Sequence, residues 1–386
     1  MSKQDKNQNA SLSTGEAVGA FDDIRPYTNA ELPAAMRRIT ESDAFPLLAS
    51  WVYPDKSIEE VRQLMLSFTT IREFQHTVMY AVNEQVIKRS ITELTYNGFN
   101  RLDPQKRYLF VSNHRDIMLD ACLLQYLLVK NGLETSEITF GANLMSPGLV
   151  TDIGKSNKMF RVERGGRFKD FYLSSKQLSD YLRYTLTQKN ESIWIAQRNG
   201  RTKDGIDATD QGIIKMFCMS CPDDKIRALS ELHIIPVSIS YEWESCDILK
   251  AIELYESRSQ KYVKKPGEDL NSILTGIVQP KGHVNISICE EVTENDLRQF
   301  DALTNNEYHR QVALLLDSRI NRAYQLSPNN FIAHDLRYGQ TAYRDHYSDE
   351  QRQTFLKYME RLNDYDVSEP DVLRDIFLGI YANPIR

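Results

Sequence analysis

Two kinds of hydrophobic pattern divide the chain into three parts. Between residues 27 and 98, apolar positions recur every three or four residues, as on one face of an α-helix. From about Leu102 to Glu291, short β-branched runs alternate with helical stretches. After Glu291 the strand-like runs stop. We therefore predict an α/β fold in which a mixed sheet is covered by helices, with a helical module before it and helices after it.

The first part, residues 25–100, is predicted to be a helical module. Glu60 follows Ser57 by three residues, a capping box that marks a helix start. The run from Phe74 to Ile91 is spaced as one face of a long helix, which Asn97-Gly98 would end.

The two ends of the chain differ in character. Residues 1–24 are rich in Ser, Asn, Gln and Lys with little to bury, so we predict a disordered tail. Residues 293–386 are predicted to be a C-terminal helical extension, with helices over 294–325 and 348–363 and an irregular stretch between them.

The middle part, residues 101–292, is predicted to hold the α/β domain. Pro236 interrupts one of its strands, and because proline lacks a donor for the sheet, this favours an edge strand or a bulge. The predicted strands are 108–111, 138–140, 192–196, 233–239 and 284–289, and the predicted helices are 117–130, 169–189, 208–221 and 243–264.

Composition narrows the class of protein. The net charge of −6 argues against a nucleic-acid binder, and 41% hydrophobic residues are ordinary for a globular protein. No stretch has the length and apolarity of a membrane span, and the polar N-terminus has no apolar signal region, so we predict a cytoplasmic protein. Five scattered cysteines indicate reduced thiols; the single Cys218-x-x-Cys221 lacks the second pair that zinc needs, which favours a packing role.

The stretch 107–120 carries the first candidate chemistry. A β-type run stops at Ser112-Asn113-His114, and a helical pattern with Asp120 near its start follows. Such a histidine is suited to remove a proton while a carboxylate fixes its tautomer and stabilises the imidazolium. The alternative is that His114 caps the helix and Asp120 is a solvated first-turn acid.

Two later stretches are basic. Residues 160–167 place three arginines around two glycines, a composition that binds phosphate or carboxylate, or else forms a solvated turn. Residues 197–205 follow the strand 192–196 directly, at the place where α/β sheets bind ligands, although an ordinary surface loop has the same composition.

Together these stretches resemble the glycerolipid acyltransferase family, the glycerol-3-phosphate and lysophosphatidate acyltransferases. Each falls in the family's motif order, and the resemblance covers roughly residues 105–290. Residues 113–120 are similar to the first motif, His-x4-Asp, 141–164 to the second, 198–205 to the third and 235–242 to the fourth.

The chain departs from the family pattern at two positions. His114 and Asp120 are separated by five residues rather than four, which rotates the carboxylate by about 100° on a helix unless the first turn is irregular. Asp116 is a second candidate partner for the histidine. The third motif lacks its glutamate: a gapless match places Arg198 there, and a one-residue deletion places Asn199 there.

The resemblance implies an O-acyltransferase of lipid metabolism. His114, aligned by Asp120, would deprotonate a hydroxyl of glycerol-3-phosphate or a lyso-glycerolipid, which attacks the thioester of acyl-CoA or acyl-carrier protein in phospholipid biosynthesis. No metal or cofactor is implied beyond the acyl donor. The residues implied in substrate binding are Asn113, Arg161, Arg164, Arg201, Thr202 and Lys203.

Two alternatives follow from the departures. The altered third motif favours a lyso-aminolipid acceptor bearing a carboxylate, and the extra residue with the lost glutamate favours a catalytically impaired protein that binds lipid or acyl carrier. Because the substrates are lipids, we also predict peripheral attachment to the inner face of the membrane through an amphipathic face of residues 27–98. The alternative is that this face is part of the core.

Overall fold

The computed structural model describes residues 19–145, 147–163, 165 and 167–385. Its centre is a seven-stranded sheet in the order β1-β7-β6-β2-β5-β3-β4. Neighbouring strands run parallel except β6 and β7, which are antiparallel. The predicted α/β class with a mixed sheet is confirmed. The strands are β1 (Ile91–Asn97), β2 (Leu109–Ser112), β3 (Glu137–Gly141), β4 (Met159–Val162), β5 (Ile193–Ala196), β6 (Ile234–Tyr241) and β7 (Gly282–Ile288).

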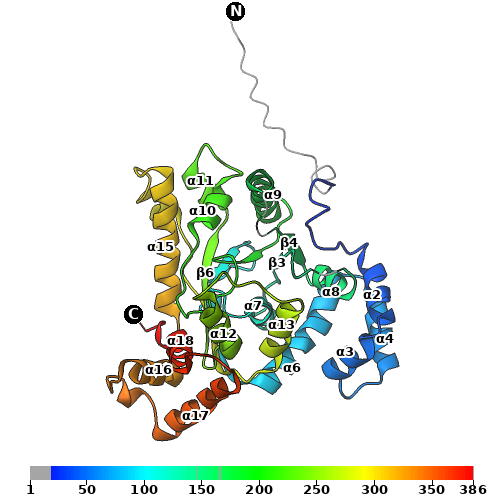
Figure 1. Cartoon of the computed structure of the whole chain (residues 1–386). Helices are drawn as coiled ribbons and strands as arrows, with labels where there is room; N and C mark the ends of the chain where they lie inside the picture. Colours follow the sequence, from blue (N-terminus) through cyan, green and yellow to red (C-terminus); the bar gives the residue numbers. More distant parts are fainter. Residues whose placement is uncertain (1–18, 146, 164, 166, 386) are drawn as a thin grey trace, which may run out of the picture.

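Helices cover both faces of the sheet (Figure 1). Side chains alternate along a strand, so Val111 of β2 packs on one face while Phe110 packs on the other. All four residues of β2 are buried, as expected for a central parallel strand. One face packs against α9 (Phe168–Thr187), α10 (Gln211–Cys218), α11 (Lys225–Ser230) and α15 (Asn305–Ala323), and the other against α6 (Tyr80–Ser90) and α7 (Leu119–Lys130).

The five predicted strands are confirmed, whereas β1 and β4 were not predicted. The helix expected to run to Gly98 is formed by α5 (Ile71–Phe74), a π-helical turn (Gln75–Met79) and α6, and it ends at Ser90. The next seven residues pair with β7 instead. Their apolar spacing fits both structures, and the free edge of β7 decides between them. The sheet therefore begins before the predicted boundary at residue 100.

Pro236 lies in a central strand, so the predicted edge strand is wrong. β6 pairs with β2 on one side and β7 on the other. The Pro236 carbonyl oxygen accepts a hydrogen bond from Cys289 N at 2.9 Å, just past the last residue of β7. Because N and O of one strand residue point to the same side, the missing proline N–H faces the end of β7, where no ladder bond is lost.

Two helical groups flank the sheet on opposite sides (Figure 1). The predicted irregular stretch before residue 348 contains the helix α16 (Pro328–Tyr338). The helix predicted over 243–264 is shorter: α12 covers Asp247–Ser257, and α13 (Glu268–Val278) follows it. The N-terminal group is α2 (Leu32–Glu41), α3 (Phe45–Val52), α4 (Ile58–Ser67) and α5, and the C-terminal group is α12 (Asp247–Ser257), α16 (Pro328–Tyr338), α17 (Asp349–Met359) and α18 (Pro370–Ala382). The remaining helices are α8 (Leu149–Ser156) and α14 (Glu294–Arg298).

The predicted disordered tail is wrong for its last residues. Phe21 packs edge-on against Tyr181 with ring centroids 5.1 Å apart, and Ile24 O accepts a hydrogen bond from Arg161 N, covering the edge of β4. Residues 1–18 of that prediction lie outside the described residues. Among the helices described here, none has both the length and the apolarity needed to cross a membrane.

Candidate active site

The structure brings His114 and Asp120 together. β2 ends at Ser112, and an irregular loop leads to α7, whose first turn carries Asp120. His114 Nδ1 lies 2.9 Å from Asp120 Oδ2, and both side chains are buried. A carboxylate accepts the proton on Nδ1, so the neutral imidazole has its lone pair on Nε2. Trp194 holds the ring edge-on, with centroids 5.8 Å apart.

The loop before α7 absorbs the extra residue of the first motif. Asp120 Oδ2 also accepts the backbone N–H groups of Arg115 at 2.6 Å and Asp116 at 3.0 Å, so the loop wraps around the carboxylate. On the other side, the Tyr241 hydroxyl donates to Asp120 Oδ1 at 2.8 Å. Burial, and then the nearby Asp120 carboxylate, raise the pKa of Tyr241, which keeps it a donor. Sequence reasoning missed Tyr241.

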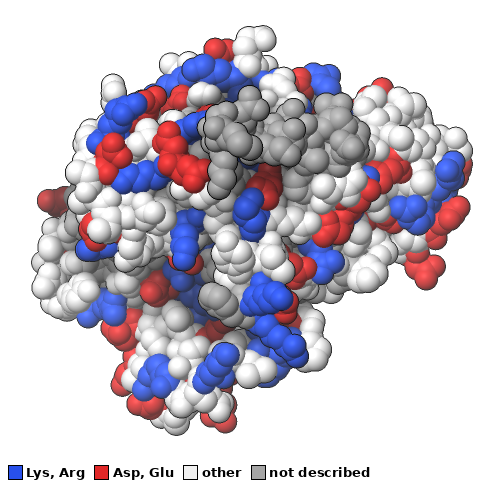
Figure 2. All heavy atoms as spheres, turned by 90° about the horizontal axis from the view of Figure 1, so that it is seen from above, with Lys and Arg blue, Asp and Glu red and all other residues white. Residues whose placement is uncertain are grey.

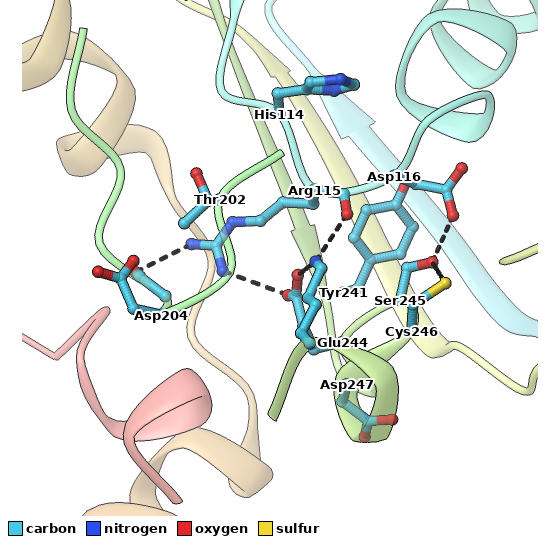
Figure 3. Close-up of polar contacts among 12 residues, drawn as sticks. His114, Arg115, Asp116, Thr202, Asp204, Tyr241, Glu244, Ser245, Cys246 and Asp247 are labelled. Atoms are coloured by element: carbon cyan, nitrogen blue, oxygen red, sulfur yellow. Dashed lines mark hydrogen bonds and ion pairs between the residues drawn. The ribbon is translucent and has the colours of Figure 1, made fainter. Parts of the chain in front are cut away.

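Asp116 faces away from His114 (Figure 3). Its Oδ1 accepts the N–H groups of Met118 and Leu119, each at 2.8 Å, and caps the start of α7. Its Oδ2 accepts a hydrogen bond from Ser245, and a Cβ added to Gly276 of α13 would collide with it. The second predicted partner of the histidine is thus engaged elsewhere, as a cap that shapes the loop.

A buried cluster of charges lies beneath the loop (Figure 3). Arg115, 1% exposed, donates to Asp207 Oδ2 at 2.6 Å and to Glu244 Oε2 at 3.2 Å. Lys250 donates to Glu244 Oε1 at 2.6 Å and to the Arg115 carbonyl at 2.7 Å. The cluster ties the His114 loop to residues 198–207 and to the start of α12. Arg115 lies within the first motif, and Asp207 and Glu244 lie two residues past the third and fourth, which was the signal available for them.

Asn113 and Thr202 are occupied by protein partners rather than turned toward a ligand. Asn113 bridges to Ile239, accepting its N–H at 2.8 Å and donating to its carbonyl at 2.9 Å. Thr202 N donates to the His114 carbonyl at 2.7 Å, and its hydroxyl donates to Asp207 at 2.8 Å. Both predicted substrate-binding residues therefore serve as scaffold in this structure.

His114 lines a cleft of about 440 Å³ at the carboxyl ends of the parallel strands, here called the His114 cleft. Its wall contains both apolar and charged side chains, a composition that suits an amphiphilic ligand. The apolar side chains include Ile117, Phe140, Leu144 and Trp194, and the polar ones include Asn143, Glu163, Asn199, Arg201, Lys203, Lys264 and Asp269.

The cations of this cleft differ in their partners. Arg201 Nη1 is buried and has no hydrogen-bond partner in the described part of the chain. Lys203 pairs with Glu253, and Lys264 pairs with Asp269, which also accepts from Asn143 at 3.0 Å. Arg161 pairs with Glu163 at 2.6 Å. The predicted Arg164 lies outside the described residues.

A second cleft, of about 490 Å³, lies at the opposite end of the sheet and is called the Glu137 cleft. Phe21, Tyr27, Tyr181 and Tyr184 contribute its aromatic wall. Each of its described cations has a carboxylate partner: Arg25 with Glu31, Arg72 with Glu134, Lys158 with Glu191 and Lys189 with Glu137.

Cys218 is a buried free thiol. Burial raises the pKa of its thiol to about 12, as expected for a packed side chain. Over the described residues, no group of three His, Cys, Asp or Glu side chains is arranged to hold a metal ion.

Residues 93–240 match the family model described as acyltransferase. No curated protein shows a significant sequence match. Among solved structures, the chain is similar to the 1-acyl-sn-glycerophosphate acyltransferase PlsC of Thermotoga maritima, with 13% identity, a TM-score of 0.34, and coverage of 76% of this chain and 97% of that one.

Proposed function

Because residues 93–240 belong to the acyltransferase family, we propose that the protein is an O-acyltransferase of phospholipid biosynthesis. It moves a fatty acyl group from the thioester of acyl-CoA or acyl-carrier protein to a hydroxyl of glycerol-3-phosphate or of a lyso-glycerolipid. The observation that carries this proposal is the His114–Asp120 hydrogen bond in the wall of a cleft lined by apolar and charged side chains.

In this mechanism His114 is the general base. As the acceptor hydroxyl oxygen attacks the thioester carbonyl, Nε2 takes the hydroxyl proton and Asp120 stabilises the imidazolium. The tetrahedral intermediate then collapses, the carbon–sulfur bond breaks, and the imidazolium returns its proton to the departing thiolate. The products are the ester and a free thiol, and no covalent enzyme intermediate forms.

The apolar and the charged side chains of the His114 cleft would contact different parts of the substrates. Phe140, Leu144 and Trp194 provide apolar surface for the acyl chain. Arg201 has a buried guanidinium nitrogen available for the anionic group of the acceptor. An arginine side chain can bind phosphate or carboxylate through two parallel N–H···O hydrogen bonds.

A lyso-aminolipid bearing a carboxylate is the second candidate acceptor. The specific observation in its favour is that Lys203 and Lys264 are already paired with carboxylates, which leaves Arg201 as the available cation on the described wall. The impaired-protein alternative loses support from the His114–Asp120 geometry, because a protein that only binds lipid has no need of an aligned base.

Attachment to a membrane surface stays a proposal. Most apolar side chains of the N-terminal helices pack against one another, while Leu47, Leu48 and Leu66 of this module are exposed. Flotation with anionic and neutral liposomes tests the idea, and Leu47→Ser should reduce binding to anionic vesicles. Recovery of the wild type only in the dense fraction with both vesicle types would refute attachment.

Thiol release from palmitoyl-CoA, measured with and without each candidate acceptor, tests the enzymatic function. We expect acceptor-dependent release that falls by about 10²- to 10⁴-fold in His114→Ala, because the general base is lost. The matched control is His233→Ala, since His233 is half-buried, pairs with Glu291 and does not line the cleft. If the wild type releases no thiol with any acceptor or donor, the enzymatic function is wrong; if His114→Ala remains active, the assignment of the base is wrong.

A further inference from the structure

The lysines of the His114 cleft are neutralised by the protein itself. Lys203 forms an ion pair with Glu253 of α12, whose side chain is only 12% exposed. Lys264, in the loop before α13, forms an ion pair with Asp269, and Asn143 on the other side of the cleft donates to the same carboxylate at 3.0 Å. Both carboxylates are therefore held in place and are not spare surface charges.

Arg201 stands apart from these lysines. Its Nη1 is buried, and among the residues that the structure describes it has no partner. Glu163, the other carboxylate of the wall, pairs with Arg161. Acidic and basic side chains are likewise interspersed on the face seen in Figure 2, which shows no large patch of one sign. The described cleft thus offers about one uncompensated positive charge.

That charge sets a limit on the ligand. A carboxylate or a phosphodiester carries one negative charge, whereas a phosphomonoester carries about 1.5 to 2 at neutral pH. Among the described residues, the second charge of a phosphomonoester would find no free cation and would lie near the carboxylates of Glu163, Glu253 and Asp269. Removing such a charge from water without a partner is unfavourable.

We propose, on the basis of the acyltransferase function proposed above, that the site prefers one group of its candidate acceptors. These are acceptors whose polar group carries a single negative charge, a carboxylate or a phosphodiester, and they are preferred over the phosphomonoesters glycerol-3-phosphate and lysophosphatidate. Glu253 and Asp269 determine this specificity by neutralising Lys203 and Lys264, and Arg201 binds the anion. Glu253, Lys264 and Asp269 lie beyond residues 93–240, so they belong to a part of the chain outside the family match.

Binding measured without a donor separates this inference from catalysis. Isothermal titration of the full chain would use four short-chain probes: glycerol-3-phosphate, hexanoyl lysophosphatidate, hexanoyl lysophosphatidylglycerol and N-(3-hydroxyhexanoyl)glycine. We expect the last two to bind at least tenfold more tightly than the phosphomonoesters. The relative affinity of these two tells a phosphodiester site from a carboxylate site.

The double variant Glu253→Gln/Asp269→Asn frees both lysines without changing side-chain shape. We expect it to shift the ratio of affinities toward phosphomonoesters by about tenfold or more, because two nearby positive charges become available. The matched control is Glu369→Gln, which removes a carboxylate paired with Arg258 on the surface and should leave the ratio unchanged.

Equal or tighter binding of phosphomonoesters by the wild type overturns the inference, and so does an unchanged ratio in the folded double variant. The wild-type ratio alone decides the matter if the double variant does not fold. Turnover assays run in parallel keep the two proposals distinct. A preference for monoanions without thiol release refutes the enzymatic function and supports the specificity. Thiol release with phosphomonoesters as the preferred acceptors supports the enzymatic function and refutes the specificity.

Discussion

The two ends of the sheet each carry a cleft of similar volume, and in only one of them does every described cation have a carboxylate partner. In the Glu137 cleft, of about 490 Å³, each described cation has a carboxylate partner. In the His114 cleft, of about 440 Å³, a buried arginine nitrogen has none within the described chain, and a histidine is held with its Nε2 lone pair available. Volume therefore does not distinguish the two clefts, whereas a buried arginine nitrogen without a partner, in the same wall as an aligned histidine, does.

The physical reason is the cost of leaving a polar group unsatisfied. A buried donor without a partner is unfavourable by about 1–3 kcal/mol, so such groups persist where a ligand completes them. The carboxyl ends of parallel strands add to this, because successive loops converge there. Substitutions at the two clefts should consequently differ in kind. Those at the His114 cleft should change activity, and those at the Glu137 cleft should change stability.

The largest effect is expected at Asp120. Asp120→Asn removes the charge that stabilises the imidazolium, so kcat should fall by about 10²- to 10⁴-fold in the thiol-release assay. Asp116→Asn is the matched variant, since Asp116 caps α7 and does not contact His114. It should lower Tm while kcat falls less than tenfold. A larger loss in Asp116→Asn than in Asp120→Asn would reverse the assignment of the partner.

Arg201→Gln should have the next largest effect. Losing a charge-assisted contact of about 1.5–3 kcal/mol corresponds to a fall of roughly 10- to 100-fold in kcat/KM for the acceptor, with KM for the donor unchanged. Initial rates at varied acceptor concentration measure it. Arg72→Gln, at the Glu137 cleft, is the control, and equal losses in the two variants would remove the contrast between the clefts.

A smaller effect is expected at Tyr241. Tyr241→Phe removes the donor to Asp120 Oδ1, a hydrogen bond to a charged group that spares the His114 contact. We expect kcat to fall by about 2- to 10-fold. This corresponds to less than the full contribution of about 1.5–3 kcal/mol from a hydrogen bond to a charged group, because Asp120 Oδ2 keeps its other partners. The pH–rate profile should shift because the carboxylate is held less firmly. An unaltered profile in a variant of normal Tm would mean that Tyr241 only fills space.

The smallest effect on activity is expected at the Glu137 cleft. Glu137→Ala strips Tyr181 and Lys189 of their shared acceptor, so unfolding free energy should fall by about 1–3 kcal/mol with kcat unchanged. Denaturant titrations and the thiol-release assay measure the two quantities. A marked loss of kcat in the folded variant would show that this end of the sheet takes part in function.

Glu137 also gives the wild type a pH dependence. Burial raises the pKa of Glu137, although Lys189 opposes the shift. Between the ordinary carboxyl pKa and the raised pKa of folded Glu137, the unfolded chain has released a proton that the folded state still binds. The contribution of Glu137 to stability therefore falls as the pH rises through this window. Glu137→Ala lacks it, and the difference in stability between the two proteins should be larger at the acidic side of the window.

Much of the fold was predictable because apolar patterns are local. Each of the five predicted strands contains buried β-branched or aromatic residues, which favour a strand packed within a sheet. β1 could not be separated from the preceding helix, since its spacing fits both and only the edge of β7 chooses. The prediction for Pro236 was wrong for the same reason. Whether a proline costs the sheet a hydrogen bond depends on where the neighbouring strand ends.

By itself, the sequence determined the α/β class, the order of the motifs and the candidate base, because these depend on residue types and local spacing. Only the tertiary structure decided which acid serves His114, since the extra residue is absorbed by a loop that wraps Asp120 and turns Asp116 toward Ser245. It alone also showed which cations are free. The pairing of Lys203 with Glu253 joins residues fifty positions apart, and charge balance in a cleft depends on such contacts rather than on composition.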